Sequence, residues 1–262
     1  METTASKTSP PLIEMKDVSV GSMRDQSTIV IEGVDWAVTA GDYWVLAGLQ
    51  GTGKTDFLMM TAGLTPPGAG SYHLFGEAMP IFDERRLPTR LRQGLVFDGG
   101  QLFNHLTVFE NIALPLRYHR NLSLGQAAEQ TKRWLKAVEL DAWADSTPGT
   151  LGRNWQKRAG LARALSLQPE ILLVDNPLGG LDLRHAWWWL GFLDQLSKGH
   201  AIMEGKRLTV IVTASDLRPW KDRAKQFAIL KERRFVVLGT WHQLEAASQE
   251  LLHELLMTER QT

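Results

Sequence analysis

The sequence predicts an α/β fold, in which a central sheet carries helices and a helical subdomain is inserted into the core. Two short apolar runs, residues 171–174 and 208–212, have the length and composition of buried parallel strands. A third, residues 42–47, leads into a glycine-rich turn, and a helix is expected from Thr55. Because strands alternate with helices along the chain, a layered α/β sheet is expected.

Three further segments complete this architecture. Residues 12–20 and 29–38 are rich in strand-forming residues. Between residues 107 and 138 the apolar side chains recur at helical intervals, which predicts the inserted helical lobe. Residues 244–255 repeat this spacing and predict a terminal helix that packs one face on the body.

The composition excludes several classes of protein. The 262 residues, 44% hydrophobic and 22% charged, are typical of a globular chain and not of a disordered or collagen-like one. Twenty-nine basic residues balance 29 acidic ones, so no overall field would attract nucleic acid or an anionic membrane. The absence of cysteine fits a reducing cytoplasm. No apolar run is long enough to span a bilayer, and residues 1–11 lack the apolar core of a signal peptide.

The strongest functional motif lies in the glycine-rich turn. Eight consecutive residues satisfy every fixed position of the phosphate-binding P-loop: Gly48, Leu49, Gln50, Gly51, Thr52, Gly53, Lys54 and Thr55. Glycines let backbone N–H groups converge on phosphate oxygens, and the start of the following helix favours an anion. Lys54 supplies positive charge, and the Thr55 hydroxyl is a ligand for Mg²⁺. The alternative is a glycine turn that binds nothing.

The second half of the site is predicted where the apolar strand at residues 171–174 ends in Asp175. A carboxylate in this place can hold a metal ion through water. Together the two segments predict ATP and Mg²⁺ as cofactors, with Thr55 and Asp175 as metal ligands.

The remaining landmarks resemble the ATP-binding subunits of ABC transporters, from residue 12 to about residue 244. Residues 94–112 resemble the loop that joins the core to the helical lobe, residues 151–165 resemble the family signature and its helix, and residues 178–182 resemble the D-loop that ends in Asp182. In residues 94–117 the chain is most similar to the branch that serves phospholipid trafficking with MCE-domain partners.

The resemblance implies a P-loop NTPase core of the RecA-like type, with an antiparallel β edge and an inserted α-helical subdomain. It divides the chain into a flexible N-terminus (1–11), a nucleotide-binding core (12–105 and 156–240), the helical subdomain with the signature (106–155) and a C-terminal helix (241–262). It also implies transmembrane permease subunits as partners, an MCE-domain protein in the lipid branch, no nucleic acid, and a peripheral position on the cytoplasmic face of the cell membrane. Two ATP-binding subunits would face each other head to tail, with each ATP between one P-loop and the opposing signature.

The sequence departs from the family pattern at positions that the resemblance assigns to hydrolysis. Asn176 stands where a carboxylate would activate the attacking water, and Asp98 stands where a glutamine would contact the metal and that water. Asp98 is still a hard oxygen donor for Mg²⁺. Depending on the alignment, Ala214 or Ser215 stands where a histidine would contact the γ-phosphate.

The signature and the adenine side differ as well. Five residues replace the Leu-Ser-Gly-Gly-Gln signature: Leu151, Gly152, Arg153, Asn154 and Trp155. Arg153 would either intrude on the phosphate of the opposing subunit or supply a substitute positive charge. No aromatic residue stands near Ser22 and Met23, where the family stacks one on adenine, and this absence weakens ATP binding.

These departures predict a subunit that binds ATP at a subunit interface and in which hydrolysis is impaired or absent, because the missing groups act as a unit. Two alternatives stay open: a non-hydrolysing structural or regulatory subunit paired with an active paralogue, and an active ATPase with compensating residues. A heterodimer is favoured over a homodimer. A DNA- or ribosome-associated ABC protein is disfavoured because long coiled coils and tandem nucleotide domains are missing, and an unrelated P-loop kinase is disfavoured by the D-loop.

Ten tryptophans are unusually many, and three of them are consecutive, at residues 187–189. The helix after Asp182 is expected to bury a stripe made of Leu183, Ala186, Leu190, Leu193 and Ser197. The side chains expected to point away from it are Trp188, Trp189 and Phe192. They would form a patch for another subunit or a bilayer, or lie under another element of the same chain. The tryptophans expected to act as packing residues are Trp134, Trp143 and Trp155.

Overall fold

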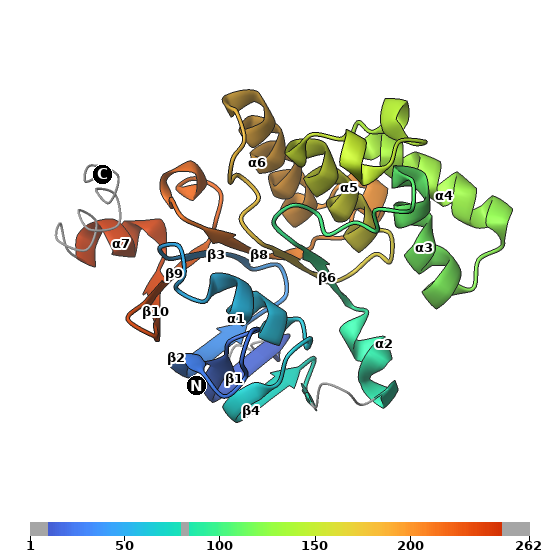
Figure 1. Ribbon diagram of the computed structural model, residues 1–262. Coiled ribbons are helices and arrows are strands. Elements are labelled where there is room, and N and C mark those ends of the chain that lie inside the picture. The colour runs from blue at the N-terminus through green and yellow to red at the C-terminus, as the bar shows by residue number, and fades with distance from the viewer. Residues whose placement is uncertain (1–9, 80–83, 248–262) are drawn as a thin grey trace, which may run out of the picture.

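The computed structural model describes residues 10–79 and 84–247, whose strands form one mixed sheet (Figure 1). In space the order is β5-β4-β1-β2-β10-β9-β3-β8-β7-β6. The strands are β1 (Ile13–Gly21), β2 (Ile29–Val38), β3 (Tyr43–Ala47), β4 (Pro67–Leu74), β5 (Glu77–Ala78), β6 (Gln93–Val96), β7 (Ile171–Val174), β8 (Thr209–Ala214), β9 (Gln226–Lys231) and β10 (Arg234–Gly239).

The two halves of the sheet differ in strand direction. Strands β6, β7, β8, β3 and β9 pair in parallel, whereas β5, β4, β1 and β2 pair antiparallel and form one edge. Every residue of β3, β7 and β8 is buried, as expected for parallel strands covered on both faces. The predicted α/β fold with an antiparallel β edge is therefore confirmed.

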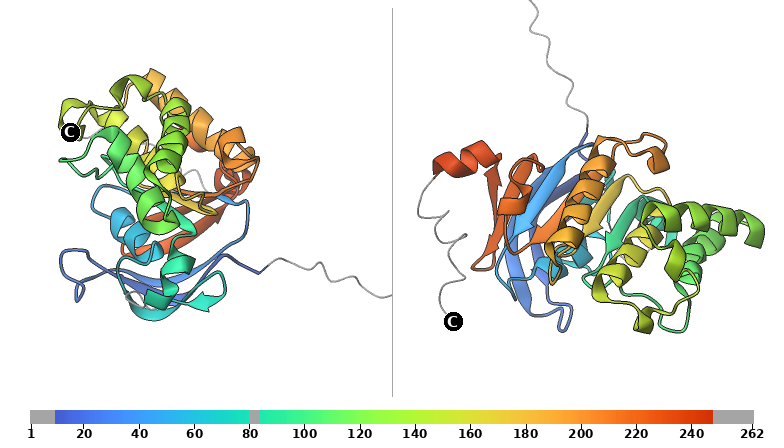
Figure 2. Two further views of the ribbon diagram at one scale, coloured as in Figure 1. Left: turned by 90° about the vertical axis from the view of Figure 1, so that its right-hand side faces the viewer. Right: turned by 90° about the horizontal axis from the view of Figure 1, so that it is seen from above.

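Seven α-helices are present in the described residues: α1 (Lys54–Thr61), α2 (Leu87–Arg90), α3 (Val108–Arg120), α4 (Leu124–Ala137), α5 (Arg153–Leu165), α6 (Leu183–Lys198) and α7 (Trp241–Ala247). The lobe predicted at residues 107–138 consists of α3 and α4, which gather with α5 at one end of the sheet (Figures 1 and 2). Thr107 and Ser123 begin α3 and α4 with capping boxes, in which the side chain satisfies a free N–H of the first turn. Asn121 ends α3 in the left-handed conformation that asparagine tolerates.

The core has two parts, one on each side of the parallel strands. One packs helices α5 and α6 against the sheet. The other surrounds α1, whose Phe57, Leu58 and Met60 are buried against strands from both halves of the sheet. Helix α1 therefore lies between the antiparallel strands and the parallel ones (Figures 1 and 2). This packing fixes the first turn of α1 at the carboxyl ends of the parallel strands.

The ends of the chain are described only in part. Leu244 in α7 is buried, and residues 1–9 and 248–262, which include most of the predicted terminal helix, lie outside the described residues. The predicted domain boundaries at residues 105, 155 and 240 stay predictions. Helix α5 begins at Arg153, before the predicted boundary at residue 155. Within residues 10–79 and 84–247, no helix combines the length and apolar character needed to cross a membrane.

The predicted orientation of α6 is wrong in part. Leu190 and Leu193 are buried as expected, but Leu183 is 79% exposed, and Trp189 and Phe192 are buried. Trp189 faces inward into the apolar core, and its indole N–H donates to the Asn154 side-chain oxygen at 3.2 Å, which ties α6 to the start of α5. The buried residues, Trp189, Leu190, Phe192, Leu193 and Leu196, themselves recur at helical intervals, so the buried face is a stripe beside the predicted one.

The remaining tryptophans also divide by burial. Trp187 is the exposed member of the triplet, at 62%, and Trp188 stacks on Phe192 at 4.8 Å between ring centroids. Trp134 is buried as a packing residue, and Trp143 and Trp155 contact each other at 6.4 Å. Of the triplet only Trp187 is exposed, so the alternative of cover by other elements of the chain holds for Trp189 and Phe192, whereas Trp143, expected as a packing residue, is 38% exposed.

The first prediction compares two tryptophans of the same helix. The Trp189→Phe variant should lose about 1–3 kcal/mol of unfolding free energy, because it opens a cavity and removes the bond to Asn154. The matched Trp187→Phe variant should change it by less than about 0.5 kcal/mol, because Trp187 is exposed. Urea unfolding followed by circular dichroism measures both, and equal losses would contradict the assigned orientation of α6.

Candidate nucleotide-binding site

The P-loop links β3 to α1 through backbone conformations that demand glycine. Gly51 and Gly53 have φ values of 83° and 88°, in the left-handed region that residues with a Cβ rarely adopt. At Gly48 an added Cβ would lie 2.5 Å from the Thr52 hydroxyl oxygen and 2.9 Å from the Leu230 carbonyl oxygen. The loop therefore needs these glycines to turn from the strand into the helix, and α1 begins at Lys54.

Lys54 folds back over its own loop. Its ammonium group donates to the carbonyl oxygens of Gly48 at 2.5 Å and Leu49 at 2.7 Å. Burial lowers the pKa of Lys54 below its ordinary value, and the negative charge of Asp175 partly opposes this effect. The cation thus lies at the start of a helix, where the backbone also favours an anion.

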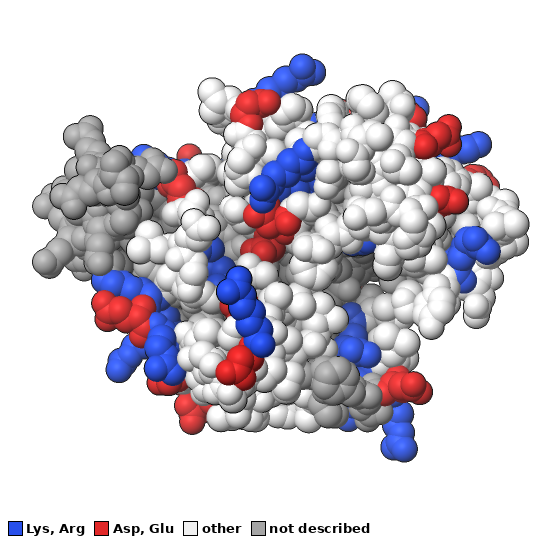
Figure 3. Space-filling model, viewed as in Figure 1, with Lys and Arg blue, Asp and Glu red and all other residues white. Residues whose placement is uncertain are grey.

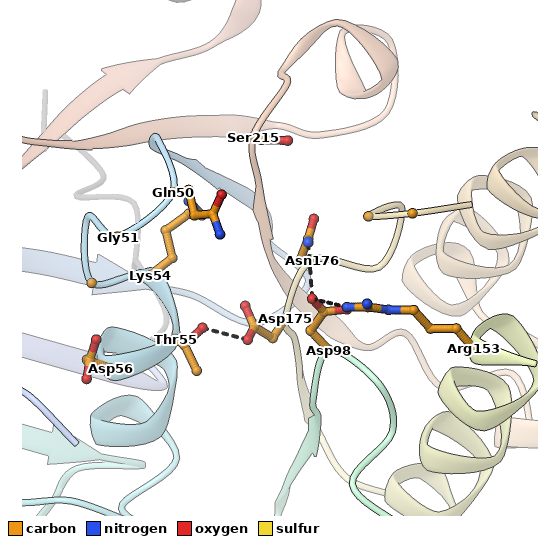
Figure 4. A pocket seen from close by; sticks show the side chains of 13 residues that line it. Gln50, Gly51, Lys54, Thr55, Asp56, Asp98, Arg153, Asp175, Asn176 and Ser215 are labelled. Atoms are coloured by element: carbon orange, nitrogen blue, oxygen red, sulfur yellow. Dashed lines mark hydrogen bonds and ion pairs between the residues drawn. The ribbon is translucent and has the colours of Figure 1, made fainter. Parts of the chain in front are cut away.

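A chain of hydrogen bonds connects three separate segments beside the P-loop. The Thr55 hydroxyl donates to one oxygen of Asp175 at 2.8 Å, and the Thr213 hydroxyl of β8 donates to the other at 2.6 Å. The same Thr213 oxygen accepts the Asn176 backbone N–H at 3.0 Å. The Asp175 carboxylate is therefore fixed at the end of β7, facing α1 (Figure 4).

These residues fit a magnesium nucleotide. Thr55 and Asp175 already present a hydroxyl and a carboxylate oxygen to each other, and Mg²⁺ prefers oxygen ligands of this kind. No group of three or more His, Cys, Asp or Glu side chains able to hold a metal occurs in residues 10–79 and 84–247. A magnesium ion here would depend on phosphate and water oxygens for its other ligands, as is usual for nucleotide-bound Mg²⁺.

Asp98 lies after β6 and is held between two cations. One carboxylate oxygen accepts from the Arg153 guanidinium at 2.7 Å, and the other forms an ion pair of 2.8 Å with the Lys157 ammonium. The Asn176 side-chain N–H donates to Asp98 at 3.3 Å. Burial raises the pKa of the Asp98 carboxyl, but the bonds and charges of Arg153 and Lys157 outweigh it, so the pKa lies below its ordinary value.

Lys157 is the fixed member of this cluster. Its side chain is 1% exposed, and its ammonium donates to the carbonyl oxygens of Asn176 at 2.8 Å and Gly179 at 2.9 Å. Burial lowers the pKa of Lys157, and the bond to Asp98 opposes this effect. Asn176 adopts a left-handed backbone conformation with φ 45°, and the loop after β7 thus turns around a buried ammonium group.

The P-loop and the Asp98 cluster line opposite sides of one cavity of about 520 Å³ (Figure 4). Figure 3 shows acidic side chains with basic ones beside them near the middle of this face, between the helical part and the strands. The cavity is lined by Gln50, Gly51, Gly53, Lys54, Thr55, Asp56, Asp98, Arg153, Asp175, Asn176, Gly179, Gly180 and Ser215.

Comparison of the sequence with known protein families identifies the family of this chain. The sequence profile described as ABC transporter matches residues 31–179, more than half of the chain. The chain belongs to the ABC transporter family. This result confirms the family named by the sequence resemblance, as an ABC transporter ATP-binding domain.

Individual relatives of this ABC domain carry different names. It is 28% identical to the intermembrane phospholipid transport system ATP-binding protein MlaF of Escherichia coli (strain K12), over 94% of this chain and 88% of that protein. It is 31% identical to the spermidine/putrescine import ATP-binding protein PotA of Trichodesmium erythraeum, over 80% of this chain and 52% of that protein. It is 37% identical to the sulfate/thiosulfate import ATP-binding protein CysA of Methylococcus capsulatus, over 66% of this chain and 48% of that protein. The chain thus spans about half the length of the last two.

Solved structures show the same fold. The cbiO1 protein of Clostridium perfringens, part of an ABC transporter complex, superimposes with a TM-score of 0.75 at 17% identity, over 96% of both chains. The bacterial ABC transporter cassette MJ0796, described as dimeric, superimposes with a TM-score of 0.73 at 27% identity, over 85% of this chain and 95% of that one.

The structure brings most predicted site residues of the ABC domain together. Of the two candidates for the histidine position, Ser215 lines the cavity, whereas Ala214 is buried at the end of β8. Arg153 is the only residue of the altered signature among those that line the cavity. Asp182 lies away from it, where its carboxylate caps α6 by accepting the His185 N–H at 3.0 Å.

Three of the other four signature residues make contacts within the chain, and Gly152 is exposed just before α5. Asn154 bonds to Trp189, and Leu151 belongs to the core. Trp155 lies against His185 with ring centroids 5.7 Å apart and under the Arg158 guanidinium at 4.7 Å. The family resemblance implies that this segment contacts the ATP of an opposing subunit. In the structure these three residues are held by contacts within their own chain.

Sequence reasoning missed three residues of the site. Asp56 lines the cavity and accepts the Met23 backbone N–H at 2.7 Å, and its place directly after Thr55 was a signal that could have found it. Thr213 and Lys157 contact Asp175 and Asp98 only through the tertiary fold. Neither carries a motif of its own.

The second prediction tests the Thr213 bond. The Thr213→Val variant should lose about 1–3 kcal/mol of unfolding free energy, because it leaves the Asp175 oxygen and the Asn176 N–H without their partner. Thr131→Val is the matched control, since Thr131 is fully buried and its hydroxyl has no hydrogen-bond partner among the described residues. Urea unfolding should find the control unchanged or more stable, and equal destabilisation by both substitutions would refute the assigned bond.

Proposed function

We propose that this ABC transporter domain binds ATP with Mg²⁺ and hydrolyses it slowly or not at all. The observation that carries the proposal is the contrast within one cavity. The binding side keeps Lys54, Thr55 and Asp175 in place, whereas the opposite side has an amide at Asn176 and a neutralised carboxylate at Asp98.

The binding roles follow from the geometry. Backbone N–H groups of the P-loop and the Lys54 ammonium would hold the phosphates, and Thr55 with Asp175 would hold the metal. When bound, Mg²⁺ neutralises phosphate charge. Lys54 is positioned for this role, because it needs only to exchange two carbonyl oxygens of its own loop for phosphate oxygens.

The cavity offers a poor general base. Its lining residues carry carboxylates only at Asp56, Asp98 and Asp175. Asp175 accepts from two hydroxyls, Asp56 accepts a backbone N–H, and Asp98 is paired with two cations. A base works best when its pKa lies near the working pH, and that of Asp98 lies below its ordinary value. Water activation is therefore expected to be slow.

The partners and cargo belong to the same proposal. The similarity to MlaF over 88% of its length supports a phospholipid-type transporter. Permease subunits, an MCE-domain partner and a position at the cytoplasmic face of the membrane are proposed with it, from the sequence resemblance. The similarity to PotA and CysA makes small-solute import the alternative. The dimeric MJ0796 structure supports a dimer, and the altered site favours an active paralogue as its second subunit. An active ATPase with compensating residues is the opposing candidate.

The third prediction tests binding. Isothermal titration of wild-type protein with MgATP should detect binding, and the Lys54→Ala variant should weaken it about 10- to 100-fold, because one charged hydrogen-bonding group is lost. A steady-state phosphate-release assay on the isolated chain should find little turnover in wild type or variant, and turnover in the complex with permease and active paralogue is expected from the paralogue's site. Turnover at the rate of ordinary transporters that depends on Lys54 would refute impaired hydrolysis, and failure of wild type to bind would refute the proposal entirely.

The fourth prediction restores the base. Asn176→Glu alone would place a second carboxylate beside Asp98, because the two side chains are 3.3 Å apart. The double variant Asn176→Glu, Asp98→Gln removes this repulsion and should raise ATP turnover at least about tenfold, within the range that a general base contributes. The single variant Asp98→Gln is the control that measures the effect of the amide at position 98 on turnover. No gain over wild type in the double variant would show that the missing base is not what limits hydrolysis.

A further inference from the structure

The carboxylate of Asp56 lies beside the phosphate-binding loop. Asp56 belongs to the first turn of α1 and lines the same cavity as Lys54. Figure 4 shows it on one side of Thr55, with Asp175 on the other. The free N–H groups at the start of a helix favour an anion, and a carboxylate in the first turn already uses part of this effect. Asp56 therefore competes with a bound phosphate for the start of α1.

The bonding of Asp56 leaves its charge in place. Its carboxylate accepts the Met23 backbone N–H at 2.7 Å, and that donor is neutral. Asp98 differs, because both of its oxygens are paired with cations. The bond to Met23, in the loop between β1 and β2, also fixes the Asp56 carboxylate at the edge of the cavity.

The charged side chains around the cavity separate into two groups. On the P-loop side, one cation, Lys54, lies with two carboxylates, those of Asp56 and Asp175. On the helical side, two cations surround the single carboxylate of Asp98. The side that would receive the phosphates therefore has more negative than positive side chains, and the positive excess lies across the cavity.

The two carboxylates of the P-loop side differ in how a metal ion would affect them. Asp175 and the Thr55 hydroxyl offer oxygen ligands to Mg²⁺, so the charge of Asp175 is offset when the ion is bound. Asp56 lies on the other side of Thr55 and keeps its charge towards the phosphates. Its repulsion grows with the negative charge of the ligand, and Mg²⁺ lowers that charge.

We propose that Asp56 is a specificity-determining residue that makes the site select metal-bound over metal-free nucleotide. The inference rests on the proposed nucleotide binding and deepens it, because it names the metal–nucleotide complex as the ligand. Metal-free ATP meets the repulsion of both Asp56 and Asp175. MgATP meets that of Asp56 alone, and against a smaller ligand charge.

The test measures the affinity of the full chain for ATP by isothermal titration, once with Mg²⁺ and once with EDTA. Asp56→Asn removes the charge and keeps an oxygen that can accept the Met23 N–H. It should strengthen binding of metal-free ATP about tenfold and that of MgATP less than about threefold. The difference should shrink at high ionic strength, because salt screens a charge effect and not a change of shape.

Asp35→Asn is the matched control. Asp35 is an exposed aspartate whose carboxylate also accepts a backbone N–H, that of Asp17 at 3.0 Å, and it does not belong to the cavity lining. The same substitution there should leave both affinities unchanged.

The outcomes separate the two claims. If wild type does not bind MgATP, the proposed function fails and the inference with it. If wild type binds MgATP but Asp56→Asn changes both affinities by the same factor, or changes neither, only the inference fails. Weaker MgATP binding by Asp56→Asn would also overturn the inference, because it would make Asp56 a ligand of the metal rather than a source of repulsion.

Discussion

The site depends on one carboxylate, Asp175, held by two hydroxyl groups from different parts of the chain. Thr55 belongs to the first turn of α1 and Thr213 to the central strand β8, and each donates to one oxygen of Asp175. Because α1 is packed between the two halves of the sheet, these contacts fix the P-loop relative to the ends of β7 and β8. The nucleotide-binding geometry is thus a consequence of how the sheet curls around one short helix.

Charge distributes unevenly across the cavity around this carboxylate. On one side, Lys54 and the start of α1 favour phosphate. On the other, Asp98 is neutralised by Arg153 and by a lysine that is almost fully buried. A carboxylate engaged in this way serves as an anchor for cations rather than as a proton acceptor. Together with the amide at Asn176, this arrangement supports the proposal that the domain binds ATP but hydrolyses it slowly or not at all.

The sequence revealed the parts of the site whose geometry is local. The P-loop and the aspartate that ends β7 each follow from a short contiguous pattern, and the structure brings them together through Thr55 and Asp175. Thr213 and Lys157 were missed because their roles arise from contacts 38 and 19 residues away in the chain. The inward face of α6 was misassigned for a different reason. The predicted stripe was started from Leu183, which is exposed, whereas the buried residues recur at helical intervals from Trp189 to Leu196.

The central claim is that the triphosphate bound by this chain stays intact, and a single-turnover measurement on the isolated chain, without a paralogue, tests it most directly. Radiolabelled ATP is mixed with excess protein and Mg²⁺, unbound nucleotide is removed, and the bound label is followed by chromatography. The account predicts that the protein retains the label and that the retained label stays ATP over many minutes. Conversion of bound ATP to ADP and phosphate within seconds, or a protein fraction that carries no nucleotide, would contradict it.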